Sequence, residues 1–127
     1  MKSDTMIKLR VSLSFDKKMY KNHAINSKNM NTVKSVILDI SGGGIRFSLS
    51  TPLEEGTYFM AQFSLALEEC TQQFNIVCKV IKCTQSLDYA DRYFARSKFI
   101  FDHITEREKI VRFVFEEERR IRRREME

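Results

Sequence analysis

The stretch from Val36 to Leu49, VILDISGGGIRFSL, decides how this chain folds. Its centre, Asp39-Ile-Ser-Gly-Gly-Gly44, lies between two runs of residues that are typical of β-strands. After the glycines, Ile45, Phe47 and Leu49 alternate with polar residues, as in a strand with one buried face. A turn with a carboxylate, a hydroxyl and three glycines exposes backbone N–H groups and leaves room for a ligand. The stretch therefore predicts two strands joined by a turn that could bind a ligand.

Alternation with a period of two recurs on both sides of this stretch, and it is typical of half-buried strands. It predicts six strands: residues 7–15, 33–40, 44–50 and 57–67, a run around residues 74–80, and residues 92–101. Residues 16–32 are polar and rich in Lys and Asn, which predicts a long loop. Residues 51–56, 68–71 and 84–91 predict the shorter connections.

The period changes after the last predicted strand. Thr105 and Glu108 form a capping box that predicts the start of a helix. Apolar residues follow at helical spacing without Pro or Gly, so we expect a helix over residues 105–124. The end of the helix interleaves five Arg with Glu, and the i,i+4 spacing predicts pairs of Glu116 with Arg120 and of Glu118 with Arg122. This pattern favours a solvated helix with its own ion pairs over a nucleic-acid patch.

Six antiparallel strands and one helix predict a mainly β fold: a six-stranded antiparallel β-barrel, closed or nearly closed, with a C-terminal α-helix packed on it. A barrel of so few strands is filled by its own side chains. A ligand should therefore bind on the outer surface, and the glycine turn at 42–44 is such a place.

The length of 127 residues and an apolar content of 43% fit a single domain. We expect one domain over residues 1–127, with an N-terminal arm at 1–6, the barrel at 7–101 and the helix at 105–124. No run approaches the roughly 18 apolar residues of a membrane span. Asp4 and Thr5 stand where a signal peptide would be apolar. We therefore expect a cytoplasmic protein without membrane insertion.

Residues that could carry catalysis are sparse. Cys70, Cys78 and Cys83 lack C-x-x-C spacing, which indicates buried or half-buried thiols rather than zinc ligands. Neither His23 nor His103 lies in a motif that would set it against a nucleophile. The glycines lack the flanks of a Walker loop or a dinucleotide fingerprint. We expect no enzyme, no catalytic residue, no metal and no cofactor.

The net charge of +5 lies mostly in the N-terminal third, where residues 16–35 hold five Lys against Asp16 alone. Such an excess favours an anionic partner, which could be a nucleotide, a nucleic acid or an acidic protein surface. The alternative is a solvated lysine-rich loop. We do not expect nucleic acid, because the aromatic residues follow core periodicity rather than an exposed stacking pattern.

The whole chain resembles a PilZ domain, a family of bacterial receptors for cyclic di-GMP. The spacing Asp39-x-Ser41-x-x-Gly44 matches the Asp/Asn-x-Ser-x-x-Gly motif of the family. Residues 93–102 resemble the final strand of the family, and Ile110 onward resembles its C-terminal helix. The resemblance implies a regulatory domain that binds cyclic di-GMP and acts through a protein partner that the sequence does not identify. The alternative is a degenerate PilZ module that binds no nucleotide and serves as an adaptor.

The resemblance also implies the ligand-binding residues, which are Arg10, Asp39, Ser41, Gly43, Gly44 and Arg46. Asp39 and Ser41 would hydrogen-bond a guanine edge, the two glycines would let the ligand approach the backbone, and Arg46 would add a phosphate contact. For Asp39, the alternative is an Asx-type bond that forms the turn without a ligand.

A second family motif, Arg-x-x-x-Arg, precedes the first strand and grips phosphates and guanine edges with planar guanidinium groups. Arg10, directly before Val11, stands where its second arginine belongs, but Met6 occupies the position of the first. Arg10 could also be an ordinary exposed strand residue. Loss of one charge-assisted partner costs about 1.5–3 kcal/mol, which lowers affinity roughly 10- to 150-fold. We therefore expect weak binding of cyclic di-GMP.

Overall fold

The computed structural model describes residues 7–13, 31–101 and 103–126. The predicted arm at 1–6 with Met6, most of the lysine-rich loop with His23, Phe15 and Asp102 lie outside these ranges. The described elements are β1 (Ile7–Leu13), β2 (Asn31–Ile40), β3 (Gly44–Leu49), β4 (Tyr58–Ala66), β5 (Thr71–Gln85), β6 (Tyr93–Ile100) and α2 (Ile104–Met126).

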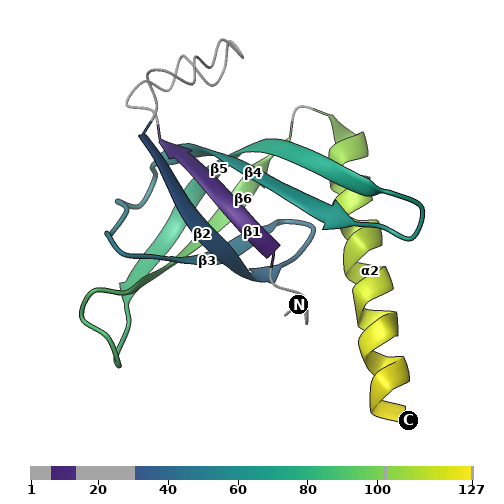
Figure 1. Cartoon of the computed structure of the whole chain (residues 1–127). Helices are drawn as coiled ribbons and strands as arrows, with labels where there is room; N and C mark the ends of the chain where they lie inside the picture. Colours follow the sequence, from purple (N-terminus) through teal and green to yellow (C-terminus); the bar gives the residue numbers. More distant parts are fainter. Residues whose placement is uncertain (1–6, 14–30, 102, 127) are drawn as a thin grey trace.

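The strands form a closed antiparallel barrel in the order β1-β2-β3-β6-β5-β4 (Figure 1). The barrel closes because β1 pairs with β2 on one side and with β4 on the other. β3 pairs with β6 and not with the next strand along the chain. The predicted six-stranded antiparallel barrel with a C-terminal helix is thus confirmed, and α2 lies along one side of it (Figure 1).

The interior of the barrel is filled by the inward side chains of all six strands. Phe47 and Phe59, both fully buried, meet edge to face with ring centroids 5.3 Å apart. Cys78 is also buried, and this burial raises the pKa of its thiol, so that the thiol is inert in the folded protein. Because the core is filled, a ligand has to bind outside the barrel.

Several predicted boundaries differ from the structure by one to a few residues, and α2, for example, ends at Met126 rather than at 124. β5 continues to Gln85, within the predicted loop 84–91, because the pairing between β5 and β6 extends to Tyr93. β2 begins at Asn31 rather than 33, since its pairing with β1 reaches Leu13. α2 begins at Ile104, one residue before Thr105, which had been expected to cap it.

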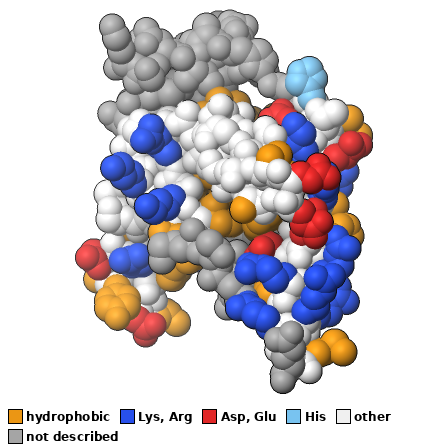
Figure 2. Space-filling model, turned by 45° about the vertical axis from the view of Figure 1, so that its right-hand side comes forward, with side chains coloured by type: hydrophobic (Ala, Val, Ile, Leu, Met, Phe, Trp, Pro, Cys, Tyr) orange, Lys and Arg blue, Asp and Glu red, His pale blue; other side chains and the backbone are white. Residues whose placement is uncertain are grey.

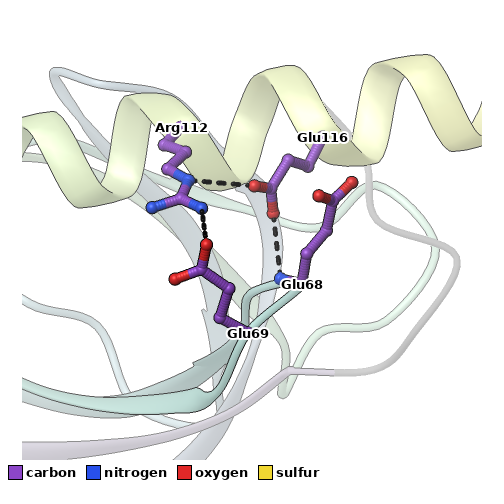
Figure 3. Close-up of polar contacts among 4 residues, drawn as sticks. All are labelled: Glu68, Glu69, Arg112 and Glu116. Carbon is purple, nitrogen blue, oxygen red and sulfur yellow. Dashed lines mark hydrogen bonds and ion pairs between the residues drawn. The ribbon is translucent and has the colours of Figure 1, made fainter.

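The helix is held on the barrel by its buried face and by a polar cluster. Ile110 and Phe113 are buried against the strands. The Arg112 guanidinium donates to the carboxylates of Glu116 (3.0 Å) and Glu69 (3.4 Å), as Figure 3 shows. Glu116 also accepts the backbone N–H of Glu68 (3.3 Å). These contacts fasten the middle of α2 to the connection between β4 and β5.

This cluster changes the expected pattern of ion pairs along the helix. Arg120 pairs with Glu117 at 2.6 Å and not with Glu116, because Glu116 is turned toward Arg112 and the strand connection. Within the described ranges, no helix combines the length and the apolar character that crossing a bilayer requires.

Candidate functional site

A β-bulge brings Asp39 to the outer surface of the barrel. Ile37 pairs with Phe47, but the next pair is Asp39 with Arg46, so one extra residue lies in β2. Strict alternation from the buried Ile37 would place Asp39 inside the barrel. Instead, Ile40 is buried and Asp39 is partly exposed. The bulge thus sets the carboxylate beside Arg46.

The turn after β2 is closed by Ser41. Its backbone N–H donates to the Gly44 carbonyl at 3.0 Å, and its Oγ accepts the N–H of Gly43 at 3.3 Å. The Gly43 carbonyl accepts the N–H of Phe99 at 2.8 Å, which ties the turn to β6. The Ser41 side chain is exposed, so its hydroxyl lies at the surface where a ligand could reach it.

The three glycines of the turn differ in what a side chain at each position would contact. A Cβ on Gly44 would lie 1.9 Å from the Ser97 carbonyl oxygen, so only glycine allows β3 to approach β6 there. A Cβ on Gly42 would lie 2.8 Å from Cγ2 of Val111, because the turn packs against α2. A Cβ on Gly43 would meet only Ser41 Oγ, at 3.9 Å. Gly44 is therefore explained by strand packing, and Gly43 leaves open space for a ligand.

β6 supplies two cations that sequence reasoning missed. Ser97 is buried, so Arg96 and Lys98 face outward on either side of it. Arg96 pairs with Arg46 across the strands, and Lys98 pairs with Gly44. The alternation in residues 93–101 indicated that both side chains face outward, but only the pairing of β3 with β6 shows that they lie beside the turn.

These residues line one shallow pocket of about 340 Å³ on the outside of the barrel. Its side chains and turn residues include Asp39, Ser41, Gly43, Gly44, Arg46, Ile81, Arg96 and Lys98. Ile81 lies at a second register shift, in β5, and is 49% exposed. The pocket thus combines a carboxylate, a hydroxyl, three cations and an apolar surface. Such a set can bind a phosphate together with a flat, hydrogen-bonding ring.

Arg10 does not line this pocket. It lies in the middle of β1, opposite Lys34 and Gln62, and lines a different groove of about 920 Å³ beside Phe113 of α2. Lys34 and Asp39 are five positions apart along β2, or about 16 Å at the usual rise of a strand. The strand begins at Ile7, as the alternation predicted, so Arg10 lies within β1 rather than before it, where the family motif is expected. Five of the six predicted ligand residues therefore come together, and Arg10 stands apart.

Arg46 and Arg96 are like charges directly opposite one another. Such a pair is destabilising on a sheet unless another charge offsets it. The Arg46 guanidinium also lies 6.0 Å from the centroid of the Phe94 ring, which holds it over β6. Asp39, which pairs with Arg46 on its other side, already places one carboxylate beside these cations, and a bound phosphate would add a second anionic group.

A profile of the PilZ domain family matches residues 8–116 of the chain. No curated protein sequence gives a significant match. Among solved structures, MrkH of K. pneumonia superimposes with a TM-score of 0.71 at 18% identity over 98% of this chain. The PilZ domain of YcgR from Escherichia coli, solved with c-di-GMP, gives a TM-score of 0.65 at 17% identity over 96%. These identities are low, and the similarity shows the fold alone.

The Bacillus subtilis inhibitor of motility, MotI/DgrA, also has this fold, with a TM-score of 0.62 at 12% identity over 87% of this chain. The chain covers 88% of the YcgR domain, but 49% of MrkH and 46% of MotI/DgrA. It therefore spans about half the length of these two proteins.

Proposed function

Because the chain belongs to the PilZ domain family, we propose that it is a regulatory domain that binds cyclic di-GMP. The observation that carries the proposal is the pocket at the turn, where Asp39 and Ser41 lie with Arg46, Arg96 and Lys98. The YcgR domain of the same fold was solved with this ligand bound. A cyclic dinucleotide offers two phosphates and two guanine edges, which match the cations and the hydrogen-bonding groups of the pocket.

We assign each residue a role from its chemistry. Arg46 and Arg96 face each other, so one phosphate between them would accept from both guanidinium groups and relieve their repulsion. Lys98 adds a point charge beside the turn. The Asp39 carboxylate would accept from the two adjacent N–H groups on the guanine edge. Ile81 would offer apolar surface to the flat base.

A second candidate is an adaptor that keeps the PilZ fold and binds no nucleotide. The position of Arg10 favours it, because the family motif is expected to supply arginines beside the turn and Arg10 lines another groove. Met6, at the other motif position, lies outside the described residues. In both cases we propose that the domain acts through a protein partner.

Calorimetric titration with cyclic di-GMP at low salt tests the proposal. We expect weak but measurable heat, and we expect Arg96→Ala to weaken binding about tenfold or more, the loss of one charge-assisted partner. The matched control is Lys82→Ala, which removes an exposed cation opposite Arg96 but outside the pocket. No heat at about 1 mM ligand would overturn nucleotide binding and favour the adaptor.

A further inference from the structure

We propose that the outer face of α2 is a docking surface for an acidic amphipathic helix of a partner protein. The outer face comprises Ile104, Arg107, Glu108, Val111, Phe115, Arg119 and Arg122, with Met126 at its end. The proposal goes beyond nucleotide binding and does not depend on it.

The two sides of α2 differ in what covers them. Ile110 and Phe113 are 0% and 3% exposed and face the barrel. At 3.6 residues per turn, Phe115 falls on the opposite side of the helix, as do Ile104 and Met126. Phe115 is 59% exposed, and the other two are 68% and 87% exposed. The outer face thus presents large apolar side chains that no described element covers.

The centre of the outer face is hollowed. A groove of about 700 Å³ is lined by Arg107, Glu108, Val111, Arg112, Phe115 and Arg119. Val111 and Phe115 are one turn apart, and arginines lie both before and after them along the helix. An apolar pair in a groove is the setting in which a partner helix inserts a large aliphatic side chain. The arginines around the groove favour a partner helix that carries acidic side chains.

The charges of the outer face are unbalanced. Arg112 and Arg120 are already paired with glutamates. Among the described residues, Arg119, Arg122 and Arg123 have no ion-pair partner, and the predicted pair of Glu118 with Arg122 is not formed. Their i, i+3 and i+4 spacing sets them on one side, where like charges repel. Figure 2 shows Lys and Arg side chains crowded along the C-terminal part of α2. Carboxylates of a partner would relieve this repulsion.

Other occupants fit the outer face less well. A second copy would bring the same arginines against one another, with Glu108 as the one acidic residue that lines the groove. A helix that lies on a membrane needs a broad apolar face, whereas here charged residues interrupt the apolar ones at each turn. An acidic helix matches both the apolar groove and the arginines.

The surface also lies close to the turn. Val111, which lines the groove, is the residue that a Cβ on Gly42 would strike. Gly42, which lies between the pocket residues Ser41 and Gly43, therefore packs against a residue that lines the groove on α2. A partner docked on α2 would sit next to the segment that forms the nucleotide pocket.

The test uses the full chain, without nucleotide, and a designed helical peptide of about 20 residues with Leu at the a and d positions and Glu at the flanking positions. A matched peptide carries Lys in place of each Glu. By fluorescence anisotropy, we expect the Glu peptide to bind at least about tenfold more tightly than the Lys peptide. We expect Phe115→Ser and Arg119→Glu each to weaken its binding at least about tenfold.

Arg120→Gln is the matched control, because it removes a cation of the same helix that is already paired with Glu117. It should change the affinity less than about twofold. Circular dichroism would show that the exposed substitution at Phe115 leaves the fold intact. Equal binding of both peptides, or no effect of Phe115→Ser, would overturn the proposal. Binding to phosphatidylserine vesicles without binding to either peptide would also overturn it. A dimer in analytical ultracentrifugation that Phe115→Ser dissociates would do the same.

Discussion

Two basic surfaces of the barrel differ in what surrounds their cations. The turn surface comprises Arg46, Arg96 and Lys98, and the first-strand surface comprises Lys8, Arg10 and Lys34. The turn surface encloses Asp39, Ser41 and the open side of Gly43. The first-strand surface adjoins neutral polar side chains such as Gln62 and Ser64, and the carboxylate that lines its groove, Glu117, is already paired with Arg120. Positive charge is therefore common to both surfaces, and the proposed nucleotide site differs in the acceptor groups that a guanine edge needs.

The difference arises from the regularity of the strands. The pairing of β1 with β2 runs from Ile7↔Ile37 to Leu13↔Asn31 without a register shift. The turn surface is flanked by two shifts, one between Ile37 and Asp39 and one between Val80 and Lys82. Each shift lets an extra side chain face outward. The two register shifts thus bring the Asp39 carboxylate and the apolar Ile81 side chain to the same pocket.

The largest effect is expected from Gly44→Ala, which breaks the turn surface without changing any cation. The added Cβ would lie 1.9 Å from a backbone oxygen of β6, so the strands must separate. We expect a loss of about 3 kcal/mol or more in the free energy of unfolding, measured by urea denaturation. The Cys78 thiol, buried and with its pKa raised by burial, should then react with thiol reagents sooner.

Gly43→Ala is the matched control, since its Cβ would have only one contact, at 3.9 Å. It should change the free energy of unfolding by less than about 0.5 kcal/mol. Equal losses from the two substitutions would contradict the packing explanation for Gly44.

A second effect compares one arginine from each surface. We expect Arg96→Ala to lower the affinity for cyclic di-GMP roughly 10- to 150-fold. Arg10→Ala should lower it less than about threefold, because Arg10 lines the groove beside α2. Calorimetric titration of the two variants measures both changes in affinity. If Arg10→Ala lowered the affinity for cyclic di-GMP as much as Arg96→Ala, the two surfaces would have to form one binding site.

Asp39→Asn separates the ligand role of Asp39 from its role in the turn. Asn keeps the shape and can form an Asx-type bond, so the free energy of unfolding should stay within about 0.5 kcal/mol. The amide replaces one acceptor oxygen with a donor, so affinity should fall about tenfold. A drop in stability with unchanged affinity would show that the carboxylate serves the turn.

The smallest effect is expected on the first-strand surface, where Arg10 lies directly opposite Lys34. Lys34→Glu turns this like-charge pair into an attractive one. The free energy of unfolding should rise by about 0.2–1 kcal/mol, seen as a higher urea midpoint that is less marked at high salt. A lower midpoint would mean that the repulsion at this surface is already offset.

Local periodicity accounts for what could be predicted. Alternation identified the inward residues of the regular strands, and the change of period after residue 103 identified the helix, because both patterns depend on neighbours in the chain. The spacing from Asp39 to Gly44 identified the turn. Five of the six predicted ligand residues, all from residues 39–46, accordingly line one pocket.

By itself, the sequence determined six strands followed by a helix, the turn at residues 39–44 and the buried face of the regular strands. Only the tertiary structure decided that Arg96 and Lys98 join the turn, that Arg10 lies elsewhere and that Gly44 is required by Ser97. The physical reason is register. Hydrogen bonds between strands far apart in the chain set which side chains are neighbours, and a single bulge reverses a face, neither of which local periodicity records.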